Sequence, residues 1–163
     1  MQEMELIGVR VEMPTNAPMV LLRERAGGDR IVPIYIGAQE ATAIALALDG
    51  VDTPRPMTHD LMRDLLEELS VDLVRVVVTG LHEKTFFAEL HLCVADQTHV
   101  VSSRPSDAIA LAVRTDTPIF AEEAVINEVG FRESDPQEAP QPEEVVEEFK
   151  EFLDNISPED FED

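Results

Sequence analysis

The pentapeptide AIALA occurs twice in this chain of 163 residues, at positions 43–47 and again at 108–112. The two copies are 65 residues apart, and the same offset aligns the segment VRV at 9–11 with VRV at 74–76. Each AIALA copy also follows three runs with strand-like patterning. Two matches at one offset, with the same order of elements, favour internal duplication of a βββα unit. Coincidence between two alanine- and valine-rich segments is the alternative.

The pattern of apolar and polar residues predicts an α+β fold, in which duplicated βββα units form a compact sheet-and-helix domain. Runs of apolar and alternating residues between turn-forming residues predict strands at 4–13, 19–25, 30–36, 71–80, 85–96, 98–103 and, more briefly, 117–123. Helical spacing predicts helices at 38–50, 59–70, 104–115 and 121–130. We expect Gly50 to cap the first helix at its C-terminus and Thr58 to cap the second at its N-terminus.

The AIALA helices are apolar on every face, so each must be covered on more than one side. Alanine is the strongest helix former, and its small side chain lets neighbouring backbones approach closely. One side of each helix can pack on the sheet. The other side can be covered by a second helix of the same monomer or by a second subunit. We therefore predict a homodimer to which one of these helices contributes, with two core helices in one monomer as the alternative.

Acidic residues divide the chain into two regions. Residues 133–163 carry 13 Asp or Glu and one Lys, which predicts an acidic linker, a short amphipathic helix and a disordered tail. Residues 1–132 carry 21 acidic and 11 basic residues and are expected to form the folded domain. The net charge of −22 disfavours nucleic acid as a partner, although it does not exclude it, because phosphate contacts normally require a basic face.

Several features indicate a cytoplasmic protein that does not enter a membrane. The single cysteine, Cys93, rules out an internal disulfide and is expected to be a small core residue. No apolar stretch approaches the roughly 20 residues needed to span a bilayer. The first residues, MQEMELIG, lack the basic and apolar regions of a signal peptide.

Candidate functional residues gather where the helices are expected to begin: Glu40 before the first AIALA, His59 and Asp60 at the second helix, and Arg104, Ser106 and Asp107 before the second AIALA. Ser and Asp at such positions also cap free backbone N–H groups, so capping alone is an alternative for Ser106 and Asp107. Histidine is a weak cap and can act as a general base, and arginine can bind a phosphate in a forked geometry. Carboxylates with a histidine can hold Mg²⁺ or Mn²⁺, although no HxH, CxxC or HExxH motif occurs.

Three segments, PIYIGAQEATAIALAL, RPMTHDLMRDLLEEL and SSRPSDAIALAVRTDTPIF, resemble the bifunctional nuclease domain family in their order and spacing. The resemblance covers about residues 1–130 and implies a compact α+β domain, often dimeric, with DNase and RNase activity in some members. The motif residues that carry over are Glu40, Thr58, His59, Asp60, Arg104, Ser106 and Asp107.

The main functional hypothesis is a nuclease of broad specificity that hydrolyses phosphodiester bonds of DNA, RNA or both with a divalent metal ion. Its candidate catalytic residues are Glu40, His59, Asp60 and Asp107, with Arg104 and Ser106 binding substrate. The alternative is a non-catalytic dimeric regulatory module that binds a protein or a ligand. A third interpretation is a ligand sensor that uses the RPSD turn as an anion site.

Overall fold

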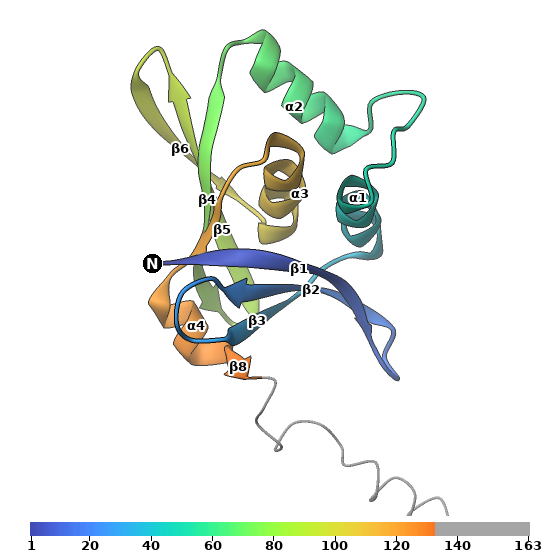
Figure 1. The fold of residues 1–163 in the computed structure, drawn as a ribbon, viewed down its shortest axis with the longest axis vertical. Coiled ribbons are helices and arrows are strands. Elements are labelled where there is room, and N and C mark those ends of the chain that lie inside the picture. Colours follow the sequence, from blue (N-terminus) through green and yellow to red (C-terminus); the bar gives the residue numbers. More distant parts are fainter. Residues whose placement is uncertain (133–163) are drawn as a thin grey trace, which may run out of the picture. The chain divides into compact units, whose positions relative to one another are not determined.

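Within residues 1–132, which are the part of the chain that the computed structural model describes, eight strands form one sheet (Figure 1). The sheet order is β6-β5-β4-β7-β1-β2-β3-β8. The strands are β1 (Gln2–Glu12), β2 (Ala17–Glu24), β3 (Arg30–Tyr35), β4 (Asp72–His82), β5 (Thr85–Val94), β6 (Gln97–Ser103), β7 (Ile119–Ala121) and β8 (Phe131–Arg132). The helices are α1 (Ala38–Leu48), α2 (Thr58–Glu68), α3 (Pro105–Thr115) and α4 (Glu123–Val129). The α+β class is confirmed. The linker, helix and tail expected at 133–163 lie outside the described residues.

The order of elements repeats along the chain as the sequence predicts. Strands β1, β2 and β3 form one antiparallel series followed by α1, and β4, β5 and β6 form another followed by α3. Strand β7 joins the two series, because it pairs in parallel with β4 and antiparallel with β1. Figure 1 shows α1, α2 and α3 grouped beside the sheet.

The VRV match at the offset of 65 residues is not structural. In β4, Val76 pairs with Ile119 of β7, whereas in β1 the residue opposite Ile119 is Met4. Val9 and Val11 instead pair with β2, beyond the segment of β1 that meets β7. The AIALA copies are also displaced, since the first begins at the sixth residue of α1 and the second at the fourth residue of α3. The order of elements is therefore repeated, but residues 65 positions apart do not occupy equivalent places in the two units.

Helix α3 forms the centre of the core. Its five residues Ala108–Ala112 are each at most 1% exposed, because the helix packs on β4 and β5 and is flanked by α1 and α2. Helix α3 is thus covered within one chain, and the homodimer stays a prediction. Helix α1 buries Ala41, Ala43 and Ile44, and its Leu48 is exposed.

The ends of most elements lie one or two residues from those predicted, and two further features differ from the prediction. Thr58 is the first residue of α2, and Met57 takes the N-cap position. The Asp60 carboxylate accepts the Met57 backbone N–H at 2.9 Å, so capping comes from the third helical residue and not from Thr58. Strand β8, which pairs with β3, is not among the predicted strands, because two residues are too few to show alternation. No helix within residues 1–132 is long and apolar enough to cross a membrane.

Hydrogen bonds of Arg30 connect the β2–β3 hairpin to α4. The Arg30 guanidinium donates to both carboxylate oxygens of Glu24, at 2.8 and 2.7 Å. It also donates to Glu123 at 2.8 Å and to Asn127 at 2.7 Å, both on α4. The Glu24 side chain is only 3% exposed, and the hydrogen bond from Arg30 holds its pKa below the ordinary value of 4.5.

We predict that Glu24 makes stability depend on acid pH. A carboxyl whose pKa is lower in the folded than in the unfolded state stabilises the fold above its unfolded pKa, and this contribution is lost as the pH falls through the folded pKa. The Glu24→Gln variant is therefore expected to be less stable at pH 7 and to lose less stability between about pH 5 and pH 3, a difference of up to ~1.4 kcal/mol per pH unit. Urea unfolding of wild type and Glu24→Gln at several pH values in this range measures the free energy of unfolding of each protein. A free energy that falls by the same amount in both proteins would contradict the prediction.

Candidate active site

Side chains from the first turns of three helices line one cleft of about 240 Å³, which we call the His59 cleft. Helices α1 and α2 both pack against α3, which brings their N-terminal ends together. Four of the six predicted site residues lie in this cleft, namely Glu40, His59, Arg104 and Asp107. The remaining lining residues are Gln39, Ala43, Met57 and Thr58.

His59 and Asp107 form a hydrogen-bonded pair between α2 and α3. The His59 Nε2 lies 3.0 Å from Asp107 Oδ1, and the two side chains are 10% and 26% exposed. Partial burial raises the pKa of the Asp107 carboxyl, but hydrogen bonds from Arg104 and His59 outweigh this effect and hold the pKa below its ordinary value. An ionised carboxylate only accepts, so Nε2 carries the proton of this hydrogen bond. In the neutral imidazole, Nδ1 is then the nitrogen with a free lone pair.

Arg104 joins this pair to α1. Its Nε and Nη2 donate to Asp107 at 2.7 and 3.0 Å, and Nη2 also lies 3.1 Å from Glu40 Oε1. The Asp107 carboxylate raises the pKa of Arg104, so the guanidinium is always charged. Its side chain is 65% exposed, and within residues 1–132 no group occupies Nη1. The guanidinium therefore presents free donors to solvent while its other edge is held in place.

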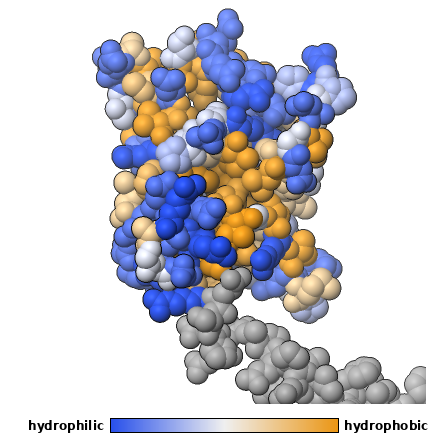
Figure 2. Space-filling view, viewed as in Figure 1, coloured by the Kyte–Doolittle hydropathy of each residue, from blue (hydrophilic) through white to orange (hydrophobic). Residues whose placement is uncertain are grey.

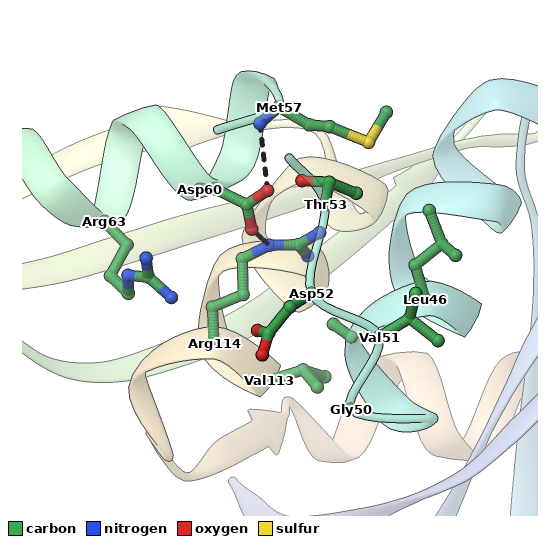
Figure 3. Close-up of a pocket in the computed structure, with 11 residues that line it drawn as sticks. Leu46, Gly50, Val51, Asp52, Thr53, Met57, Asp60, Arg63, Val113 and Arg114 are labelled. Atoms are coloured by element: carbon green, nitrogen blue, oxygen red, sulfur yellow. Dashed lines mark hydrogen bonds and ion pairs between the residues drawn. The ribbon is translucent and has the colours of Figure 1, made fainter. Parts of the chain in front are cut away.

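Asp60 does not line the His59 cleft. Its Oδ1 accepts from Arg114 Nε at 2.6 Å, and Arg114 also donates to the backbone oxygens of Ala110 and Ala43. The Arg114 side chain is 5% exposed. Its hydrogen bond to Asp60 lowers the pKa of the Asp60 carboxyl, and the hydrogen bond from the Met57 amide lowers it further. Figure 3 shows this pair beside a separate pocket between α1, α2 and α3. The observed contacts of Asp60 connect three helices, and its predicted place in the common cleft is wrong.

Ser106 also lies apart from the His59 cleft. It is buried, with 6% of its surface exposed, and lines a neighbouring pocket that shares Arg104 with the cleft. Its expected role as a cap is not seen, because no side chain caps α3.

The chemistry of the cleft suits a divalent metal better than its geometry does. Two carboxylates and an imidazole are ligands that Mg²⁺ or Mn²⁺ can take. However, no group of three or more His, Cys, Asp or Glu within residues 1–132 is arranged to hold a metal ion. Both Asp107 oxygens and Glu40 Oε1 already contact Arg104. With Arg104 in this position the cleft therefore does not fit a metal ion, which could bind Asp107 and Glu40 only if Arg104 moved away.

Sequence reasoning missed Arg114 and the cleft residue Met57. Arg114 is the only charged residue of α3 after Asp107, and a lone arginine near the end of an apolar helix was a usable signal for a buried partner. Met57 gave no comparable signal, since its place depends on how the loop before α2 enters the helix.

Comparisons with known proteins identify the family of this chain. The family model of the bifunctional nuclease domain matches residues 20–134. An uncharacterized protein of Mycobacterium tuberculosis is 49% identical over 165 residues, which cover 99% of this chain and 98% of that protein. The protein named bifunctional nuclease 2 of Arabidopsis thaliana is 30% identical over 125 residues, which cover 74% of this chain and 38% of that protein. For bifunctional nuclease 1 of the same plant the identity is 28%, over 71% of this chain and 36% of that protein. The chain thus spans less than two fifths of the length of these plant relatives. On the match over residues 20–134, this chain belongs to the bifunctional nuclease domain family.

Proposed function

We propose that the chain is a nuclease that hydrolyses phosphodiester bonds of DNA, RNA or both, and that the His59 cleft is its active site. The observation that carries the proposal is the hydrogen-bonded set of His59, Asp107 and Arg104 in one cleft. Membership of the bifunctional nuclease domain family, and the names of the plant relatives, support it.

Arg104 is the proposed phosphate-binding residue. A guanidinium matches two phosphate oxygens in a forked geometry, and Arg104 is largely exposed with Nη1 free of protein partners within residues 1–132. Asp107 and Glu40 hold its other edge, so little side-chain entropy is lost when phosphate binds. The positive charge would also stabilise the charge that develops on the phosphate in the transition state.

His59 is the proposed general base. With the Nε2 proton donated to Asp107, the lone pair on Nδ1 can take a proton from a water molecule whose oxygen attacks the phosphorus. The phosphorus–oxygen bond to the departing sugar oxygen then breaks, and that oxygen takes a proton from solvent. The ionised Asp107 then stabilises the imidazolium that forms and keeps the ring in one orientation. Water as the nucleophile is consistent with cleavage of both DNA and RNA, because it does not use the ribose 2′-hydroxyl.

A need for Mg²⁺ or Mn²⁺ remains a prediction. Such an ion would require Arg104 to leave Asp107 and Glu40, since their oxygens are otherwise occupied. Activity that survives EDTA would assign the chemistry to His59 and Arg104 alone.

The alternative is a non-catalytic dimeric regulatory module that binds a protein or a ligand. A homodimer and a cytoplasmic location stay predictions under either function. The observation in favour of the regulatory module is exposed apolar surface on α2. Leu61, Leu65 and the C-cap residue Leu69 are spaced four residues apart and are 52%, 52% and 67% exposed. Figure 2 shows hydrophobic residues gathered across the middle of one face. Light scattering measures whether two copies associate.

The test of the proposed function is a nuclease assay on highly purified protein, with and without EDTA. We expect wild-type protein to cleave DNA or RNA and Arg104→Ala to lower kcat roughly 10²-fold, because a donor to the developing phosphate charge is removed. Arg55→Ala, which removes an exposed arginine from the loop before α2, is the matched control and should retain the activity. Equal cleavage by wild type and Arg104→Ala would indicate a contaminant or a different site.

A further inference from the structure

A second pocket, of about 370 Å³, lies on the other side of Arg104. We call it the Lys84 pocket, after the residue that closes it from the β4–β5 turn. Its lining includes two cations, Lys84 and Arg104, and no Asp or Glu, although the chain has a net charge of −22. Its volume falls within the roughly 300–1,000 Å³ of small-molecule sites. The composition of this pocket, opposite in sign to the rest of the protein, points to an anionic ligand.

Ser106 is the buried polar group of the Lys84 pocket. It is 6% exposed, lines the pocket, and has no hydrogen-bond partner among residues 1–132. It occupies the second position of α3, after Pro105, and no side chain caps this helix. The backbone N–H groups of a first helical turn lack partners within the helix and carry its positive dipole end. A serine hydroxyl without a protein partner, on a residue that lines the pocket beside such a terminus, is suited to a phosphate group.

Lys84 reaches the pocket from an unusual backbone conformation. It follows Glu83 in the two-residue turn between β4 and β5, and both residues have positive φ, 65° and 49°. Such turns favour Asn and Gly, because a side chain is disfavoured in the left-handed region. Lys84 is also the only lysine in residues 1–132. Lys84 thus places a second positive charge beside Arg104 at the pocket.

Two aromatic rings complete the pocket. Tyr35, at the end of β3, is 52% exposed, and Phe86 lies at the start of β5. Aromatic side chains stack on unpaired bases of any sequence, whereas the bases of a duplex are stacked on one another. Cations and a helix terminus for phosphate, with aromatic rings for a base, form the pattern of a single-stranded nucleic-acid site.

We propose that the Lys84 pocket binds the nucleotide next to the scissile phosphodiester, with its phosphate at Lys84, Ser106 and the start of α3 and its base against Tyr35 or Phe86. Arg104 lines both the pocket and the His59 cleft, so one strand can occupy both. This inference rests on the proposed function and deepens it, because it names single-stranded nucleic acid as the substrate class.

The test measures binding separately from cleavage. Fluorescence anisotropy with a labelled single-stranded oligodeoxythymidylate of about ten nucleotides, within the site sizes of single-strand binders, gives the Kd, with His59 replaced by alanine in every protein compared so that the proposed base is absent and the strand is not cleaved. We expect Lys84→Gly to raise the Kd roughly 10-fold and to reduce the salt slope by about one. Glycine suits the positive φ of this position, so the variant should melt no lower than wild type. Lys84→Arg keeps the charge and should restore most of the affinity.

A second variant tests the base contact. Phe86→Leu keeps apolar volume but removes stacking, and we expect it to raise the Kd roughly 10-fold with an unchanged salt slope. Wild-type affinity in both Lys84→Gly and Phe86→Leu would overturn the proposal, and so would a duplex that binds as tightly as the single strand. Competition by thymidine monophosphate at equal affinity would also overturn it, because the pocket would then take free nucleotides.

The outcomes separate the two proposals. If the protein binds the oligonucleotide through Lys84 but never cleaves it, the pocket stands and the nuclease proposal fails. If it cleaves with unchanged KM in both variants, the nuclease stands and the pocket proposal fails.

Discussion

Replacing His59 by alanine is expected to lower the rate of phosphodiester hydrolysis by roughly 10²- to 10⁴-fold, the usual contribution of a positioned general base. The expectation follows from the hydrogen bond of Nε2 to an ionised Asp107, which leaves Nδ1 to accept a proton. KM should change less than kcat, because phosphate binding is assigned to Arg104. Initial rates at several concentrations of a single-stranded oligonucleotide measure both constants.

The matched control for His59→Ala is His91→Ala. His91 is also mostly buried, with 15% of its side chain exposed, and it also lies near a carboxylate, 3.3 Å from Glu89. It belongs to β5 and lines neither the His59 cleft nor the Lys84 pocket. His91→Ala should therefore retain the wild-type rate. A His59→Ala protein that melts cooperatively and cleaves within about twofold of wild type would show that His59 is not the base.

Replacing Asp60 by asparagine is expected to be the most damaging single change to stability among the site residues. The substitution leaves the Arg114 guanidinium, with its side chain 5% exposed, without an ionised partner. Removal of one partner from a buried ion pair typically costs 3–5 kcal/mol. We expect a loss near the lower end, about 3 kcal/mol, because the asparagine amide oxygen can still accept one hydrogen bond. This corresponds to a fall in Tm of roughly 10 °C.

The matched control is Asp64→Asn on the same helix. Asp64 also pairs with an arginine, Arg63, at 2.7 Å, but the two side chains are 40% and 34% exposed. Exposed pairs contribute about 0–1 kcal/mol, so this variant should melt close to wild type. Thermal unfolding of the three proteins separates the cases. Similar melting temperatures for Asp60→Asn and wild type would mean that the Asp60–Arg114 pair does not hold α2 to α3.

Much of the fold was predictable because its signals are local. The apolar run that contains Val76 and Val78 predicted β4, and the all-apolar AIALA segment of α3 correctly indicated a helix covered on every side. The three motif segments also identified the family correctly. The short strand β8 and the N-cap of α2 were not predictable, since each depends on tertiary contacts and not on local pattern.

The site was predictable in outline but not in detail. Adjacent residues of a helix point about 100° apart, because a turn takes 3.6 residues. His59 therefore enters the cleft while Asp60 turns to Arg114, and Asp107 enters it while Ser106 faces the Lys84 pocket. Position at a helix start could not distinguish these neighbours. Lys84 was missed for another reason, since only the three-dimensional fold brings the β4–β5 turn beside the start of α3.

The most direct test of the nuclease site compares wild type, His59→Ala, Asp107→Asn and the double variant in single-turnover hydrolysis of one labelled oligonucleotide. Because Asp107 acts by orienting His59 and Arg104, the losses should not multiply, and the double variant should lie within about threefold of the slower single variant. That result would identify the pair as one catalytic unit in a way that a contaminating nuclease cannot imitate. Equal rates for all four proteins, or losses that multiply, would contradict the account.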